Sequence, residues 1–89
     1  MNYLHHEITL SADDVVEVTL DAAANVRLMD DLNYAQYRKG AQHHYYGGFA
    51  KKSPVQIPAP RAGHWHVVID LGGYGGTVGA SIRLLQGAA

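Results

Sequence analysis

The stretch Gly63-His64-Trp65-His66-Val67-Val68-Ile69-Asp70-Leu71 decides the fold of this chain. Its large apolar residues recur at every second position, which are Trp65, Val67, Ile69 and Leu71. Successive side chains of a strand point to opposite faces of a sheet, so this alternation predicts a strand with one buried face. We therefore expect Trp65 in the core and His64, His66 and Asp70 together on the opposite, outer face.

The same alternation recurs along the chain on both sides of this stretch. It predicts five strands, at residues 3–10, 15–21, 25–30, 64–71 and 77–85. Two more strands are expected at 42–50 and 53–58, and a glycine-rich hairpin loop at 72–76 is expected to join strands 64–71 and 77–85. Short strands separated by frequent turns are typical of an all-β fold, here a small antiparallel β-sandwich or a partly open barrel of about seven strands.

One short helical segment is expected near residues 31–39. Asp30 or Asp31 is suited to cap its start, and Gly40 is suited to end it. Acidic residues at the start and basic residues at the end also match the helix dipole.

Length and composition limit the classes of function. The 89 residues form one domain, placed at 1–89 with its packed part at 3–85 and a frayed tail at 86–89. Seven Lys+Arg against eight Asp+Glu give a net charge of −1, which argues against nucleic acid and against an acidic membrane as partner. The absence of cysteine excludes a disulfide scaffold, a thiolate metal site and a thiol nucleophile. With no targeting or membrane-spanning segment visible, we expect a cytoplasmic protein. We also expect no cofactor.

The six histidines fall into three pairs, and only His64 and His66 share one face of a predicted strand. A His-x-His pair on a strand is a metal-ligand spacing, and Asp70 lies further along the same face. A third ligand is expected from His43 or His44 if that segment pairs nearby. The alternative is that the histidines are solvated side chains on an outer sheet face, because two ligands do not make a site.

Tyrosines and basic residues cluster between positions 34 and 61 and form a second candidate binding surface. Tyrosine and arginine are common in binding hot spots, although the tyrosines alternatively cover a thin core with their hydroxyls exposed. The glycine loop does not match a phosphate-binding template, because a strand rather than a helix follows it. The candidate ligand-binding residues are therefore His64, His66, Asp70, Tyr45, Tyr46 and Arg61.

Four segments resemble a bacterial family of domains of unknown function, DUF1883. They are 15–21, 25–33, Tyr46-Gly47-Gly48-Phe49, and the block from Gly63 to Gly73, whose Gly-His-Trp-His-Val-Val run is the most specific. The resemblance spans residues 3–85. It implies a compact β-rich domain that stands alone or is attached to a Toll/interleukin-1-receptor (TIR) domain, and it implies no activity. A module attached to a signalling domain is usually a sensor or binding domain.

Two functions from different classes fit these observations. The first is a non-enzymatic module that binds or senses a small ligand or a protein partner. The second is a small metal-dependent enzyme or metal-binding protein that uses the face of His64 and His66. No serine lies in a nucleophile motif, so we assign no catalytic residue and favour the first function. A homo-oligomerisation module is a third possibility.

Overall fold

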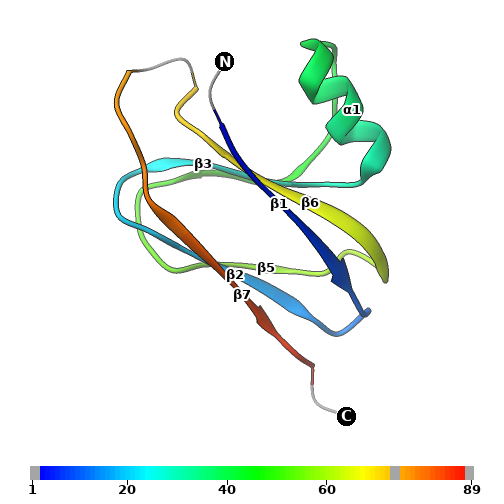
Figure 1. Ribbon diagram of the computed structural model, residues 1–89. Coiled ribbons are helices and arrows are strands. Elements are labelled where there is room, and N and C mark those ends of the chain that lie inside the picture. The colour runs from blue at the N-terminus through cyan, green and yellow to red at the C-terminus, as the bar shows by residue number, and fades with distance from the viewer. Residues whose placement is uncertain (1–2, 73–74, 88–89) are drawn as a thin grey trace.

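The computed structural model describes residues 3–72 and 75–87 of the chain and has seven strands and one helix (Figure 1). In chain order these are β1 (Tyr3–Leu10), β2 (Val15–Leu20), β3 (Ala24–Met29), α1 (Asp31–Lys39), β4 (Tyr46–Ala50), β5 (Val55–Pro58), β6 (Gly63–Asp70) and β7 (Ala80–Leu85). The all-β prediction with one short helix is confirmed. The one helix in these two ranges is too short to cross a membrane.

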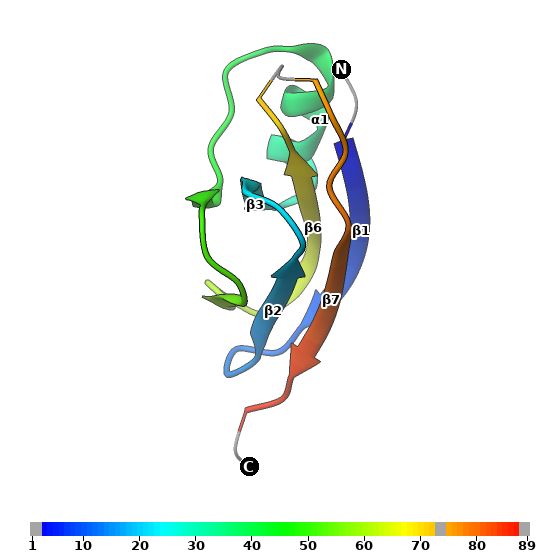
Figure 2. The ribbon, with the colours of Figure 1, turned by 90° about the vertical axis from the view of Figure 1, so that its left-hand side faces the viewer.

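The strands form two antiparallel sheets packed face to face. A four-stranded sheet has the order β1-β6-β3-β4, and a three-stranded sheet has the order β5-β2-β7. Figure 2 shows that β4 and β5 lie on one side of the molecule, whereas β1 and β7 lie on the other. The two sheets remain separate, so the fold is a sandwich and not a closed barrel.

The core fills the space between the two sheets. Trp65 is 2% exposed and packs in one cluster with Val67 and Ile69 of its own strand, as the alternation predicts. Val16 and Val18 of β2 face them from the other sheet. The Trp65 indole N–H donates to the carbonyl oxygen of Arg61 at 3.1 Å, so the one polar atom of this side chain is satisfied.

Helix α1 covers the outer face of the four-stranded sheet. Asp30 caps it by accepting from the Asn33 backbone N–H at 2.9 Å, and Gly40 ends it in the left-handed region at φ +73°. The buried ring of Tyr37 packs against Met29 and Val68 on the sheet. The four-stranded sheet is therefore buried on both faces near its middle.

Several predicted boundaries and one connection are wrong. The glycine-rich segment is not a hairpin loop, because β6 and β7 belong to different sheets and the chain crosses between them. Strand β7 begins at Ala80. Before it, two hydrogen bonds join Gly79 to Asp21: the Asp21 backbone N–H donates to the Gly79 carbonyl oxygen at 3.0 Å, and the Gly79 N–H donates to the Asp21 carboxylate at 2.7 Å. Positive φ occurs at Gly72 and Gly76 and not at Gly75, while Gly73 lies outside the described residues.

Other corrections are smaller. Strand β4 begins at Tyr46 and not at 42, since the backbone N–H of His44 donates to the side chain of Asn33 in the first turn of the helix. In the predicted frayed tail, the Gly87 N–H donates to an Asp14 carboxylate oxygen at 3.3 Å, and residues 88–89 lie outside the described part.

Candidate functional site

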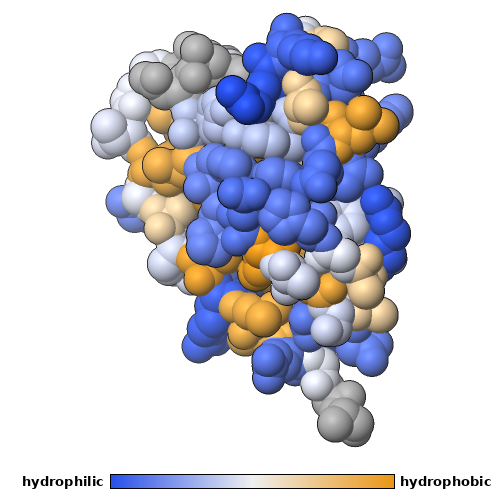
Figure 3. Space-filling view, turned by 45° about the vertical axis from the view of Figure 1, so that its right-hand side comes forward, coloured by the Kyte–Doolittle hydropathy of each residue, from blue (hydrophilic) through white to orange (hydrophobic). Residues whose placement is uncertain are grey.

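A polar groove of about 690 Å³ lies over β1, β6 and the helix. Figure 3 shows hydrophilic side chains gathered on the side of the molecule that carries β1. Eight residues line the groove: Tyr3, His5, Glu7, Asp31, Tyr34, Arg38, His64 and His66. We call this the histidine groove.

Strand pairing and helix periodicity bring these residues together. The β1–β6 register places Glu7 directly opposite His66, so the outward side chains of the two strands are neighbours. The helix contributes Asp31, Tyr34 and Arg38, whose spacing of three and four residues puts them on one face. The prediction that His64 and His66 share the outer face is confirmed. Helix α1 lies beside them and lines the same groove.

A chain of hydrogen bonds runs through the groove. The Tyr3 and Tyr34 hydroxyls are 3.1 Å apart, the Tyr34 hydroxyl is 3.2 Å from His5 Nδ1, and His5 Nε2 is 2.8 Å from His66 Nδ1. His66 Nε2 then lies 2.6 Å from Asp31 Oδ1. Because the ionised carboxylate only accepts, a neutral His66 would donate from Nε2 and accept at Nδ1 from the His5 Nε2–H. This direction of donation satisfies every member of the chain with both rings neutral.

Ring stacking holds the same side chains in place. The Tyr34 ring stacks on His5 at 4.2 Å between centroids and on His66 at 4.3 Å, with interplanar angles of 15° and 12°. Burial lowers the pKa of His5, and the neighbouring His66 lowers it further. Burial and the hydrogen bond to Tyr3 raise the pKa of Tyr34 to about 12. His5 and Tyr34 therefore favour their neutral forms at neutral pH.

His64 lies between two carboxylates in the groove. Its Nδ1 is 2.8 Å from Asp31 Oδ1, and its Nε2 is 3.2 Å from Glu7 Oε1. The hydrogen bonds from His66 and His64 lower the pKa of Asp31, so this carboxylate is ionised at neutral pH. Glu7, His64 and His66 each offer one ligand atom, and these three atoms lie within 4.8 Å of one another.

The third potential ligand is thus Glu7 and not His43 or His44. The pairing of β1 with β6 explains this difference, since it aligns Glu7 with the His-x-His pair. His43 instead precedes β4, with Nδ1 2.9 Å from the carbonyl oxygen of Ala41.

Asp70 shares the outer face with His64 and His66 but does not line the histidine groove. It is 2% exposed, and its carboxylate accepts from Asn25 at 2.8 Å, Arg27 at 3.1 Å, the Tyr37 hydroxyl at 2.7 Å and the Gly72 backbone N–H at 2.9 Å. Burial acts to raise the pKa of Asp70, but these hydrogen bonds outweigh it and the pKa is lowered. Asp70 therefore ties α1 to β3 and to the segment after β6.

Tyr45, Tyr46 and Arg61 lie together at a different place from the histidine groove. They line a smaller cavity of about 270 Å³ beside Trp65. The Arg61 guanidinium lies 4.7 Å from the centroid of the Trp65 ring and pairs with Asp30 at 3.0 Å. The predicted candidates therefore divide into two groups, and only His64 and His66 belong to the groove.

Sequence reasoning missed most of the groove residues. In the first strand, His5, Glu7 and Thr9 alternate with His6, Ile8 and Leu10, which puts His5 and Glu7 on the face opposite the apolar residues Ile8 and Leu10. The pairing of that strand with β6 was not visible in the sequence. The missed residues are Tyr3, His5, Glu7, Asp31, Tyr34 and Arg38.

Comparison with known proteins gives one match. The family model described as a domain of unknown function (DUF1883) matches residues 1–88. No curated protein and no solved structure matches the chain.

Proposed function

The chain belongs to the DUF1883 family, and from that premise we propose that it is a non-enzymatic binding module whose histidine groove binds a divalent transition-metal ion. The observation that carries this proposal is the convergence of Glu7, His64 and His66 within 4.8 Å. It joins the two functions expected from the sequence, a small-ligand module and a metal-binding face. A role as sensor and an attachment to a TIR domain remain predictions.

The donor atoms decide the class of ion. Two imidazoles and a carboxylate suit Zn²⁺, Ni²⁺ or Cu²⁺, whereas Ca²⁺ and Mg²⁺ prefer sites built from oxygen alone. Ligand atoms that lie about 2.0–2.2 Å from one ion are at most about 4.4 Å apart. Glu7 and His64 are exposed strand side chains, so small rotations bring them to that spacing.

Asp31 supports the site from the first turn of the helix. Its Oδ1 contacts both imidazoles, so it orients His64 by accepting from Nδ1 while Nε2 faces Glu7. A carboxylate that accepts from the second nitrogen of a ligand histidine fixes the tautomer and raises its basicity. To free His66 Nε2 for a metal ion, Asp31 has to give up one hydrogen bond, and its exposed side chain has room to do so. His66 then carries its proton on Nδ1 and donates to His5 Nε2 instead of accepting from it. The hydrogen bonds between His5 and Tyr34 and between Tyr34 and Tyr3 reverse in the same sense.

The groove lacks the aliphatic hydroxyl, thiol and amine side chains of the common covalent mechanisms. Its eight lining residues include no serine, threonine, lysine or cysteine. The pKa of Tyr34 is raised, so its hydroxyl is a poor nucleophile at neutral pH.

Titration calorimetry and thermal unfolding of the chelator-treated chain, prepared without a histidine tag, test the proposal. We expect Zn²⁺ or Ni²⁺ to bind with one-to-one stoichiometry and to raise the melting temperature, because an ion that binds only the folded state stabilises it. Affinity should fall between pH 7 and pH 5 as protons compete for the imidazoles. Glu7→Gln and His64→Ala should each weaken binding at least tenfold.

His6→Ala is the matched control. His6 is also exposed and adjoins Glu7, but it points to the other face of β1 and does not line the groove. Its substitution should leave the affinity unchanged. The proposal fails if no saturable binding occurs, or if Glu7→Gln and His64→Ala bind as tightly as the parent chain.

A further inference from the structure

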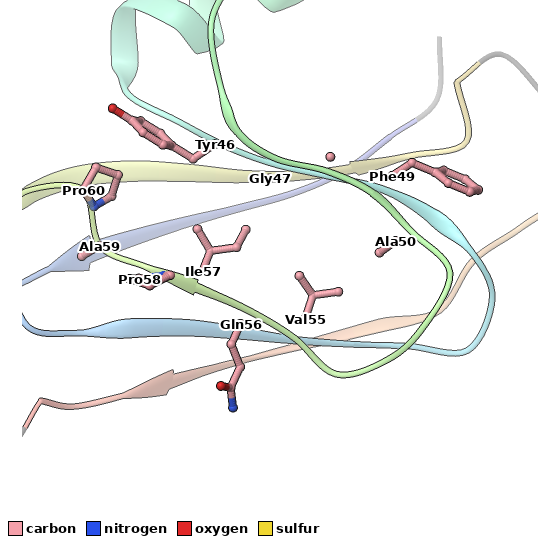
Figure 4. Close-up of a pocket in the computed structure, with 11 residues that line it drawn as sticks. Tyr46, Gly47, Phe49, Ala50, Val55, Gln56, Ile57, Pro58, Ala59 and Pro60 are labelled. Carbon is pink, nitrogen blue, oxygen red and sulfur yellow. The ribbon is translucent and has the colours of Figure 1, made fainter.

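A second groove, mostly apolar, separates β4 from β5 (Figure 4). Its volume is about 620 Å³, and it lies on the side of the sandwich opposite β1 and β7. Val55 and Ile57 point from β5 toward β4, whereas Gln56 points away. We call it the edge groove; residues 46–50 and 55–60 line it.

Both strands beside the edge groove are edges of their sheets. Within residues 3–72 and 75–87, β4 pairs only with β3, and β5 pairs only with β2. Three prolines lie in or beside β5. Pro54 precedes the strand, Pro58 ends it, and Pro60 follows two residues later. Because proline has no backbone N–H, these residues remove hydrogen-bond donors from that edge. Strand β4 has neither proline nor a charged residue. Of the two edges, β4 is therefore the one that can accept another strand.

The β4 edge is also open and carries apolar side chains. Phe49 is 61% exposed and Tyr46 is 50% exposed, although both are large hydrophobic residues. A Cβ built on Gly48 would meet no atom within 4 Å, so no other group covers β4 on the side to which that Cβ would point. An exposed edge beside an apolar groove is the arrangement used in strand addition, where backbone hydrogen bonds give affinity and pockets give specificity.

The charges around the edge groove are positive. Lys51 and Lys52 directly follow β4, and neither has an ion-pair partner within 4.0 Å among the residues that the structure describes. No acidic residue lines the groove. Asp21 lies near both lysines around a small depression, and its carboxylate accepts from the Gly79 backbone N–H at 2.7 Å. Two positive charges therefore lie beside one negative charge at this end of β4.

We propose that β4 binds an extended peptide of a partner protein, antiparallel to itself, with apolar side chains in the edge groove and acidic residues at the peptide's N-terminal end. In an antiparallel pair, the start of the peptide lies beside the end of β4, where Lys51 and Lys52 follow. A second copy of the chain fits less well, because its own β4 would place 43–45 near these lysines, and none of those residues is acidic. This site is independent of the histidine groove.

Fluorescence anisotropy with a labelled probe peptide tests the proposal. The probe has two acidic residues followed by three Val-Thr repeats, and the control peptide has two lysines in place of the acids. We expect the acidic probe to bind at least fivefold more tightly than the control peptide, and the difference to shrink at high salt. Phe49→Ser and the double change Lys51→Glu with Lys52→Glu should each weaken binding of the acidic probe at least fivefold.

Matched control variants lie on the helix. Leu32 is 68% exposed and Lys39 is exposed, and neither lines the edge groove. Leu32→Ser and Lys39→Glu should leave probe binding unchanged, and amide shifts in NMR spectra should concentrate in β4 and β5.

Two results would overturn the proposal. One is equal binding of the acidic and basic peptides, or probe binding that Phe49→Ser does not alter. The other is a concentration-dependent dimer in sedimentation that Phe49→Ser abolishes, because the occupant would then be a second copy.

Discussion

Replacing Asp70 by asparagine removes a buried negative charge while it keeps the size of the side chain. In the parent protein Oδ2 accepts from Arg27 and Tyr37, and Oδ1 accepts from Asn25 and the Gly72 N–H. Asparagine has one acceptor oxygen, so one of these two pairs of donors must face the amide NH₂ group, which is itself a donor. The change also leaves the largely buried Arg27 guanidinium without its ion-pair partner.

The magnitude follows from this loss. Hydrogen bonds to charged groups contribute about 1.5–3 kcal/mol each, and removal of one partner from a buried ion pair costs about 3–5 kcal/mol. The two estimates describe overlapping interactions, so we expect a loss of about 3–5 kcal/mol in the free energy of unfolding. For a domain of this size, 1 kcal/mol corresponds to about 4–8 °C, and the melting temperature should therefore fall by about 12 °C or more.

The pH dependence gives a second measurement of the same effect. The pKa of Asp70 is lower in the folded chain than in the unfolded chain. Its contribution to stability is therefore complete above the unfolded pKa of about 4 and is lost as the pH falls through the folded pKa. The difference in stability between the parent and Asp70→Asn should be full at pH 7 and should shrink below pH 4.

Urea unfolding followed by circular dichroism measures both quantities. Asp13→Asn is the matched control, because it removes the same charge from an exposed residue and should change stability by less than about 0.5 kcal/mol. A loss below about 1 kcal/mol for Asp70→Asn, or a difference that does not change with pH, would refute the reasoning that this carboxylate holds the helix on the sheet.

Three further predictions concern the core, the histidine groove and a glycine. Trp65→Ala should lower the free energy of unfolding by about 3–5 kcal/mol, because it empties the centre of the core; an unchanged denaturation midpoint would contradict this packing. Burial and His66 lower the pKa of His5, so the unfolded chain binds a proton more readily, and stability should be lost as the pH falls through about 6.5 toward the folded pKa. Melting curves in chelator from pH 7 to pH 5 should show a smaller decrease for His5→Gln than for the parent, and equal slopes would exclude His5 as the cause. Gly47→Ala should cost about 1–3 kcal/mol in denaturant unfolding, because φ is +119° and the added Cβ would meet the carbonyl oxygen of Val26; a neutral result would show that β4 moves freely at this point.

The sequence by itself determined the local elements and their faces. Alternation placed Trp65 in the core and put His64 and His66 together on the outer face. The capping residue Asp30 and the left-handed Gly40 fixed the ends of the helix. Each of these features depends on residues that are close in the chain, since period, capping and turn chemistry act over a few positions.

Only the tertiary structure decided which elements are neighbours. A period of two tells which face a side chain occupies, but not which strand or sheet lies beside it. For that reason the sequence did not reveal that Glu7 lies opposite His66, or that the segment after β6 crosses to the other sheet. The same limit applies to Asp70, which the alternation placed on an outer face. It is buried because α1 returns over that face, and the donors of the helix and of β3 occupy its carboxylate.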